Sequence, residues 1–209
     1  MFFEVDVTRR IGNGRIALAF SSDAPVTALV GPSGVGKTTA LNMIAGVLAP
    51  DRGRIAVGGR LLFDSERGVN LPPEHRRCGY VFQDDRLFPH LNVRHNLDYG
   101  RKLAPADAQW VDTDDVIELL GLQHLLGRRP RTLSGGEARR VAIGRALLAG
   151  PDFLLMDEPL TSLDAFRRDE ILSAVERIRD SFALPILYVT HQQGEVERIA
   201  DHVVAMTHR

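Results

Sequence analysis

The segment from Gly31 to Thr38 constrains this chain more than any other part of its sequence. It reads GPSGVGKT, which fits the pattern G-x-x-x-x-G-K-[ST], and it lies between an apolar run, residues 26–30, and a helix-like run, residues 38–48. A strand, a glycine-rich loop and a helix in this order form a cradle, because backbone N–H groups and the positive end of the helix then face an anionic phosphate. The sequence therefore predicts that the chain binds a nucleoside triphosphate.

Individual positions of this loop have distinct expected roles. The glycines at 31, 34 and 36 let the backbone approach a phosphate without a clashing Cβ, Lys37 can reach the β- and γ-phosphates, and the Thr38 hydroxyl can bind Mg²⁺. A chance glycine-rich turn beside a surface lysine is the alternative, which the surrounding strand and helix disfavour. The predicted nucleotide contacts in this region are Gly31, Pro32, Ser33, Gly34, Val35, Gly36, Lys37, Thr38 and Thr39.

The composition is that of a globular enzyme domain. At 209 residues, with 44% hydrophobic and 25% charged residues, the chain can bury one good core or two small ones. The net charge of −1 and pairs such as Arg76-Arg77 and Arg139-Arg140 make no continuous basic stripe, so we expect no nucleic-acid partner and interpret these pairs as solvated faces. The single cysteine allows no internal disulfide, and no secretion signal opens the chain.

Strand and turn signals divide the first two thirds of the chain. Residues 2–30 and about 53–63 hold short β-type runs with turns at Gly12-Asn-Gly14 and Gly58-Gly59, which predict a small antiparallel sheet. From about residue 86 to 127 the strand signal fades and residues 113–120 read as a capped helix, so a helical insertion is expected.

Apolar strand runs return after residue 152. They cover residues 153–156, 186–189 and 203–206, and an amphipathic helix is expected over residues 165–181. Buried strands that alternate with helices predict a parallel sheet covered on both faces. No apolar run approaches the roughly 18 residues that a membrane span needs, so the expected compartment is the cytosol.

A second motif, Leu133-Ser-Gly-Gly-Glu137, opens a predicted helix that runs to about Ala149. Ser134 and Glu137 have the spacing of a capping box, and Gly135 and Gly136 leave the first-turn N–H groups uncovered. A plain helix start is the alternative, but it gains nothing from two glycines, which cost about 1 kcal/mol each against alanine inside a helix. We therefore expect an anionic ligand to approach this helix end closely, while the stripe of residues 138, 141, 142, 146 and 149 packs in the core.

A third motif ends an apolar strand on acidic residues. The run Phe153-Leu-Leu-Met is followed by Asp157, Glu158 and Pro159. Asp157 can hold Mg²⁺ together with Thr38, and Glu158 can polarise an attacking water, a task that typically contributes about 10²–10⁴-fold. An acidic turn after a core strand is the alternative, and the phosphate loop upstream disfavours it.

Two further polar residues follow apolar strands. Gln83 comes after Gly79-Tyr-Val-Phe82, and His191 comes after Leu187-Tyr-Val-Thr190. Ligands of open parallel sheets lie at the carboxyl ends of the strands, so Gly31, Gln83, Asp157 and His191 are expected to converge on one crevice. Each of them alone would more often be an ordinary loop residue.

The order of these motifs resembles the nucleotide-binding subunits of ATP-binding cassette (ABC) transporters. The resemblance covers nearly the whole chain and rests on GPSGVGKT, Gln83, LSGGE, FLLMDE, Ser162-Leu-Asp164 and His191. It implies an α/β phosphate-loop NTPase core with a mainly parallel sheet, an antiparallel β subdomain and a helical subdomain at about residues 86–150, all within a single domain of residues 1–209. ATP and Mg²⁺ are the implied cofactors.

The resemblance also implies a role for each candidate residue. Glu158 would be the general base, and His191 would contact the γ-phosphate and orient Glu158 and the water. Gln83 would touch the metal and the water and begin a loop that senses a membrane subunit. Lys37 completes the implied catalytic set, while Thr38, Gln83 and Asp157 form the implied metal set. Two copies would pair head to tail, with each ATP between residues 31–39 of one copy and Ser134, Gly135, Gly136 and Glu137 of the other, coupled through Asp164.

A narrower resemblance links the chain to the ATPases of molybdate importers. It rests on residues 61–77 and on the runs 79–84 and 86–90. It implies uptake of molybdate or a related oxyanion through a transmembrane permease, indirectly served by a periplasmic or extracellular solute-binding protein, with this chain at the cytoplasmic face of the inner membrane. Many such ATPases carry a C-terminal oxyanion-binding domain, and since the sequence stops at Arg209 we expect none here.

Three departures from the family pattern concern binding details. Residues 8–11 contain no aromatic residue to stack on adenine, so Arg10 or Ile11 is expected to substitute. Glu137 replaces a commoner glutamine, and Gln192 follows His191 where an acid or serine is usual. In the stretch after Gln83, residues 84–91, the side chains of Leu87, Phe88 and Leu91 could line a groove for a helix of the permease. The alternative is that they pack within the helical insertion.

Other functions remain as alternatives to molybdate import. The chain could power an importer of another solute. A soluble ABC ATPase would need a long coiled-coil insertion or a second cassette, neither of which fits in 209 residues. A phosphate-loop kinase would have no use for LSGGE, and a regulator without turnover would not need both Glu158 and His191.

Overall fold

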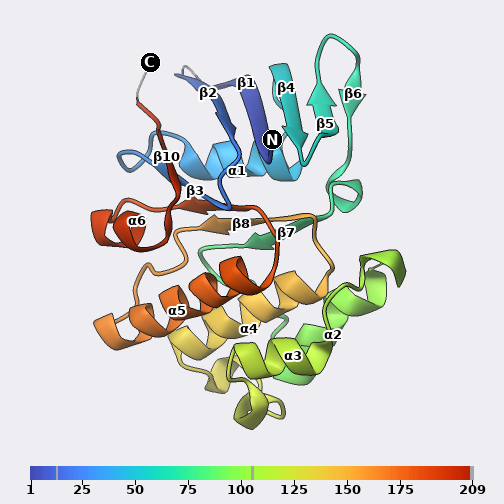
Figure 1. Ribbon diagram of the computed structural model, residues 1–209, viewed down its shortest axis with the longest axis vertical. Helices are drawn as coiled ribbons and strands as arrows, with labels where there is room; N and C mark the ends of the chain where they lie inside the picture. The colour runs from blue at the N-terminus through green and yellow to red at the C-terminus, as the bar shows by residue number, and fades with distance from the viewer. Residues whose placement is uncertain (13, 105, 208–209) are drawn as a thin grey trace.

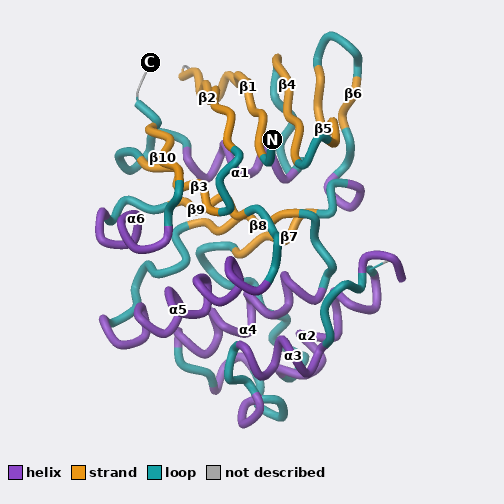
Figure 2. Tube along the Cα trace, in the orientation of Figure 1, coloured by secondary structure: helices purple, strands orange, loops and turns teal. Residues whose placement is uncertain are grey.

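An antiparallel sheet, a parallel sheet and a group of helices lie one beyond another along the long axis of the molecule (Figures 1 and 2). The computed structural model describes residues 1–12, 14–104 and 106–207. Helix α1 (Lys37–Ala45) lies between the two sheets, and the remaining long helices cover the far face of the parallel sheet (Figure 1). The predicted α/β class, with a parallel core sheet and a separate antiparallel sheet, is confirmed.

The antiparallel sheet is built from short hairpins, as the turn signals predict. Its strands follow the order β2-β1-β4-β5-β6, with bounds β1 (Phe3–Ile11), β2 (Gly14–Ser22), β4 (Arg52–Val57), β5 (Arg60–Asp64) and β6 (Val69–Asn70). Val57 pairs with Arg60 around Gly58 and Gly59, both at positive φ, which is the geometry of a tight two-residue turn. Ile11 pairs with Gly14 in the first hairpin, and Asn13, predicted in its turn, lies outside the described residues.

The second sheet contains parallel pairs throughout its described strands. Its order is β10-β3-β9-β8-β7, with bounds β3 (Val26–Val30), β7 (Cys78–Val81), β8 (Phe153–Asp157), β9 (Ile186–Val189) and β10 (His202–Ala205). In β8, Phe153 and Leu155 pack toward α1 and the antiparallel sheet, whereas Leu154 and Met156 pack toward the other helices. Both faces are therefore covered, which explains why these strands read as continuous apolar runs.

Most helices begin and end close to their predicted positions. Their bounds are α2 (Val93–Leu103), α3 (Thr113–Leu119), α4 (Gly135–Leu148), α5 (Ala165–Ser181) and α6 (Gln193–Ile199), with short 3₁₀ turns η1 (Pro73–His75), η2 (Ala106–Ala108), η3 (Gln123–Leu125) and η4 (Pro130–Thr132). Helix α1 stops at Ala45, short of the predicted Leu48, because Gly46 takes the left-handed conformation that ends a helix. The segment between β7 and β8 is helical, and its division from the core at residues 86–150 stays a prediction.

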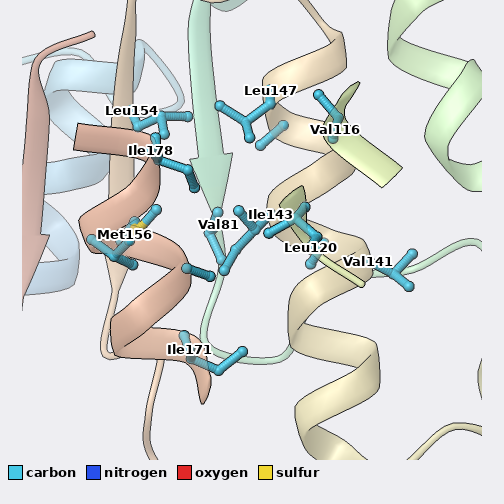
Figure 3. Close-up of a cluster of buried hydrophobic side chains, with 14 of the residues drawn as sticks. Val81, Val116, Leu120, Val141, Ile143, Leu147, Leu154, Met156, Ile171 and Ile178 are labelled. Atoms are coloured by element: carbon cyan, nitrogen blue, oxygen red, sulfur yellow. The ribbon is translucent and has the colours of Figure 1, made fainter. Parts of the chain in front are cut away.

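Helix α4 is the centre of the helical layer and is buried on more than the one predicted stripe. Ile143 and Leu147 join Val141 in a cluster that also receives side chains from α3, α5, β7 and β8 (Figure 3). A Cβ on Gly144 would lie 2.9 Å from Leu97 and 3.1 Å from Leu120, so this glycine lets α2 and α3 approach the helix closely. This close packing holds α4 against its neighbouring helices.

Two arginines depart from the prediction that the arginine pairs are solvated. Arg76 is fully buried and Arg139 is 3% exposed. In both residues the guanidinium donates to backbone carbonyls of distant segments: Arg76 to Met43 and Ile44, and Arg139 to Phe82 and Gln83. Arg76 also donates to the nearby carbonyl of Leu71. Hydrogen bonds to the protein thus replace the water that would otherwise solvate these charges. A sequence pattern of paired arginines does not reveal this arrangement.

Candidate functional site

The phosphate loop connects β3 to α1 as predicted, and its helix starts without a side-chain cap. Gly36 is the N-cap residue, in the left-handed conformation, and as a glycine it offers no side-chain hydrogen bond to the first turn. The first-turn N–H groups are donors that need an acceptor from elsewhere. A helix end of this kind suits a phosphate, because both the N–H groups and the helix dipole favour an anion.

The three loop glycines serve different purposes. A Cβ on Gly31 would lie 2.6 Å from the carbonyl oxygen of Met206, and one on Gly36 would lie 2.6 Å from the Ile16 side chain. Gly34, with φ +79°, faces no atom of the described residues within 4 Å. Gly31 and Gly36 are thus required by packing against neighbouring segments, while the space beside Gly34 is open; the phosphate contacts expected of all three glycines stay predictions.

Lys37 is drawn into the loop that precedes it. Its side chain is 5% exposed, and its Nζ donates to the carbonyl oxygens of Gly31 (2.9 Å) and Pro32 (3.1 Å). The same Nζ lies 3.6 Å from Oε1 of Glu158. A buried ammonium group held over the loop places a positive charge where the phosphate oxygens of a nucleotide are expected.

Glu158 contacts two of the other candidate catalytic residues, Lys37 and His191. Its Oε2 accepts a hydrogen bond from the Thr161 hydroxyl (3.1 Å) and lies 3.4 Å from Nδ1 of His191. The carboxylate is 19% exposed and the imidazole 52% exposed, so both can meet a ligand from solvent. Glu158 has φ +44°, an uncommon conformation for a residue with a side chain, and strain of this kind is concentrated at functional sites.

A cavity of about 560 Å³ lies beside this group. Thr38, Gln83 and Asp157, the predicted metal set, all contribute to its wall, together with Gly135 from the start of α4. Of the four residues expected to converge on one crevice, Gln83 and Asp157 line this cavity, whereas Gly31 and His191 are not among its lining residues. Gln83 is exposed, and Asp157 is almost fully buried.

Asp157 fits a hard cation such as Mg²⁺. Burial raises the pKa of its carboxyl, while a hydrogen bond with Thr38 opposes this effect. Its Oδ1 is buried and has no hydrogen-bond partner among the described residues. An unpartnered carboxylate oxygen beside a threonine hydroxyl is a set of ligands that Mg²⁺ prefers. Among the described residues, no group of three or more His, Cys, Asp or Glu offers another metal site.

The LSGGE motif forms the predicted capping box. Ser134 Oγ accepts from the Glu137 N–H (3.3 Å), and Glu137 Oε2 accepts from the Ser134 N–H (2.7 Å). The bond from the Ser134 backbone lowers the pKa of Glu137, so this helix end already carries a carboxylate. The glycines face the start of α5 and the segment before it: a Cβ on Gly135 would lie 3.2 Å from Leu163, and one on Gly136 3.3 Å from Arg167. Close packing is thus a second reason for two glycines here.

Residues around His191 and Asp164 have structural roles that the sequence did not reveal. Glu195 is buried and accepts from the Thr190 hydroxyl (2.7 Å), which in turn accepts from the Gln192 N–H (3.1 Å). This chain of bonds fixes the turn that carries His191. Asp164 caps α5 by accepting from the Arg167 N–H (3.0 Å).

A smaller cavity of about 280 Å³ borders the other side of the phosphate loop. Ile11, Ile16 and Gly34 line it, and Arg10 does not. Of the two residues expected to replace an aromatic contact, only Ile11 is therefore next to the loop, and Ile16 accompanies it.

The fold and the site define a phosphate-loop nucleotide-binding domain with an additional helical layer. A family model described as "ABC transporter" matches residues 18–161. The chain belongs to the ABC transporter family, as its motifs predict.

Similar proteins agree with this assignment. The chain is 55% identical over 201 residues to the molybdenum import ATP-binding protein ModC of Rhodospirillum rubrum, a match that covers 96% of this chain and 54% of that protein. It is 54% identical over 206 residues to the protein of the same name from Mesorhizobium japonicum, covering 99% and 56%. The chain thus spans about half the length of these curated relatives.

Solved structures share the fold. The cbiO1 protein of Clostridium perfringens, described as part of the ABC transporter complex cbiONQ, superposes with a TM-score of 0.82 at 27% identity, covering 99% of this chain and 84% of that one. A nucleotide-free ATP-binding cassette from an ABC transporter gives the same TM-score at 24% identity, over 98% and 87% of the two chains, and supports the fold alone.

Proposed function

We propose that this chain is the ATP-hydrolysing subunit of an ABC importer. The observation that carries the proposal is the contact of Glu158 with Lys37, Thr161 and His191 at the end of β8, beside a phosphate loop. A carboxylate held between an ammonium group, a hydroxyl and an imidazole is suited to take a proton from a water that attacks a phosphate.

In this proposal each residue has one task in hydrolysis. The loop N–H groups and Lys37 bind the β- and γ-phosphates, and Glu158 accepts the proton of the attacking water on its carboxylate. Thr161 and His191 fix the direction of that carboxylate, with Nδ1 of His191 3.4 Å from Oε2. Thr38 and Asp157 would hold Mg²⁺, with Gln83 at its edge, and the ion would supply positive charge to the phosphate oxygens. The adenine would pack on Ile11 and Ile16.

Lys37 offers the direct test of nucleotide binding. We expect Lys37→Ala to weaken binding of MgATP at least about tenfold, because a desolvated charge-assisted contact to phosphate contributes about 1.5–3 kcal/mol. Lys102, the other lysine of the chain, is exposed near the end of α2 and provides the matched control. Calorimetric titration with MgATP measures both. Equal affinities for the two variants would remove Lys37 from the site.

We further propose that two copies pair head to tail around ATP. The uncapped start of α1 in one copy and residues Ser134, Gly135, Gly136 and Glu137 of the other would face the same nucleotide, with Asp164 near the contact. Gly135 is exposed, which is compatible with this arrangement. The shared γ-phosphate would join the copies, and its hydrolysis would loosen them.

A membrane permease would complete the assembly. The described residues include no helix with the length and apolarity of a membrane span. We propose docking of a permease helix on the segment after Gln83, where the ring of Phe88 lies 4.3 Å from the 44% exposed ring of Tyr99. Leu87 packs against the helical core, so it contributes to the fold as well. The subunit would then act at the cytoplasmic face of the inner membrane, with a solute-binding protein on the other side.

Molybdate, or a related oxyanion, is the proposed solute. Relatives at 54–55% identity named for molybdenum import support it. We expect the chain, expressed with its own permease and solute-binding protein in a bacterium without other molybdate uptake, to drive accumulation of labelled molybdate, and Glu158→Gln to abolish it. Uptake of a different solute alone would favour another importer. ATP hydrolysis unaffected by the permease would favour a soluble ABC ATPase.

A further inference from the structure

The loop that follows β7 is held by two arginines of helix α4. Arg139 donates from Nη2 to the Gln83 carbonyl oxygen (2.7 Å) and from Nη1 to that of Phe82 (3.2 Å), and its Nε lies 2.6 Å from Oδ1 of Asp85. Farther along the helix, Arg145 donates to the carbonyl oxygens of Asp85 (3.0 Å) and Arg86 (2.7 Å). The backbone of residues 82–86 is therefore attached to α4 by guanidinium groups.

The conformation of this loop depends on such support. Asp85 and Arg86 have φ values of +55° and +46°, which side-chain-bearing residues adopt only when their surroundings stabilise them. The Arg139 side chain is 4% exposed, and Asp85 is half-buried beside it. The Asp85 carboxyl and the buried Arg139 guanidinium form one pair, so removing either partner alone would leave the other buried beside the loop.

We propose that Arg139 is a positioning residue for hydrolysis: it holds the backbone of Gln83 so that the Gln83 side chain points into the cavity that Thr38 and Asp157 line. This rests on the proposed function, in which Gln83 lies at the edge of the Mg²⁺ site. Because Arg139 lies one turn after Gly135 and Gly136, it also joins the loop of one site to the helix end that would meet the nucleotide of a second copy.

The alternative is that Arg139 merely satisfies buried carbonyl groups. That role would affect folding stability but not turnover by folded protein. The proposed role predicts a loss in kcat, because misplacement of a contacting group by about 1 Å can cost as much as 10²-fold. The two roles are distinguished by measuring turnover, nucleotide affinity and amide hydrogen exchange at residues 82–86 on the same folded samples.

The test variant is the double substitution Asp85→Asn, Arg139→Met, which removes both charges and leaves neither buried alone. We expect kcat to fall about 10- to 100-fold, ATP affinity without Mg²⁺ to change less than about threefold, and amide hydrogen exchange at residues 82–86 to accelerate. Arg139→Lys keeps the charge and an ammonium group that can still donate to one of the two carbonyl oxygens, so it should lose less kcat than the double variant. If the double variant does not fold, Arg139→Lys replaces it, and the proposal then requires kcat to fall wherever hydrogen exchange at residues 82–86 accelerates.

Arg198 provides the matched control. It joins α6 to α5 through Asp169, Ser173 and Glu176, with no contact to residues 82–86. Arg198→Met should leave kcat at the wild-type level, because within the described residues the hydrogen bonds and ion pairs of Arg198 reach only α5 and none of the residues that act on the nucleotide in the proposed function. Faster exchange at residues 82–86 with unchanged kcat would overturn the proposal, and so would unchanged exchange. Failure of wild-type protein to hydrolyse ATP would instead contradict the proposed function, since the exchange measurement does not require turnover.

Discussion

Glu158→Gln is expected to lower ATP turnover by about 10²- to 10⁴-fold, the range that a general base contributes. The amide has nearly the shape of the carboxylate, so its oxygen can still accept from the Thr161 hydroxyl, but it cannot take a proton from water. The positive φ of Glu158 is unaffected because the substitution changes only the side chain. Steady-state hydrolysis with saturating MgATP measures the effect.

Binding of ATP should survive the same substitution. Lys37 loses one anionic neighbour at 3.6 Å and keeps its bonds to Gly31 and Pro32, so its positive charge remains available to phosphate. With hydrolysis blocked, the variant should accumulate as an ATP-bound dimer, measurable by light scattering. Glu197→Gln, an identical change at an exposed position in α6, should behave as wild type. Turnover equal to that control would reject Glu158 as the base.

Features set by neighbouring residues could be predicted from the sequence. The capping box of Ser134 and Glu137 and the bounds of α5 follow from local spacing and are found as expected. The turn at Gly58-Gly59 and the apolar strand β8 are likewise local signals. Their positions in turn bring the ends of β3, β7, β8 and β9 together, because the carboxyl ends of parallel strands share one edge.

Features that depend on distant segments could not be predicted in this way. Arginine is rarely fully buried, so the pairs Arg76-Arg77 and Arg139-Arg140 gave no sign that one member of each is enclosed. The carbonyl partners of Arg139 lie more than 50 residues away in the chain. The same holds for Gly31 and Gly36, where a Cβ would clash with Met206 and Ile16, segments that a local sequence pattern does not place beside the loop.

Arg76 stabilises the C-terminal end of helix α1. Its guanidinium is fully buried at the end of α1, where Nη1 donates to Met43 (2.8 Å) and Ile44 (2.9 Å) and Nε donates to Leu71 (2.7 Å). In the described part of the chain its partners are uncharged oxygens, and burial lowers its pKa from the usual value. The charge is offset by these oxygens and by the negative end of the helix dipole.

Arg76→Met is expected to lower the free energy of unfolding by about 3–5 kcal/mol, because it leaves the terminal carbonyls of α1 buried without their donor, at roughly 1–3 kcal/mol each. The matched control is Arg54→Met, which removes an exposed pair with Glu4 at 3.3 Å and should cost about 0–1 kcal/mol. Urea unfolding at neutral pH compares the two. The first turn of α1 contains Lys37 and Thr38 of the phosphate loop, so Arg76→Met should also weaken nucleotide binding at urea concentrations below those that unfold the whole protein. Equal unfolding midpoints for the two variants would show that this helix end does not need the Arg76 side chain.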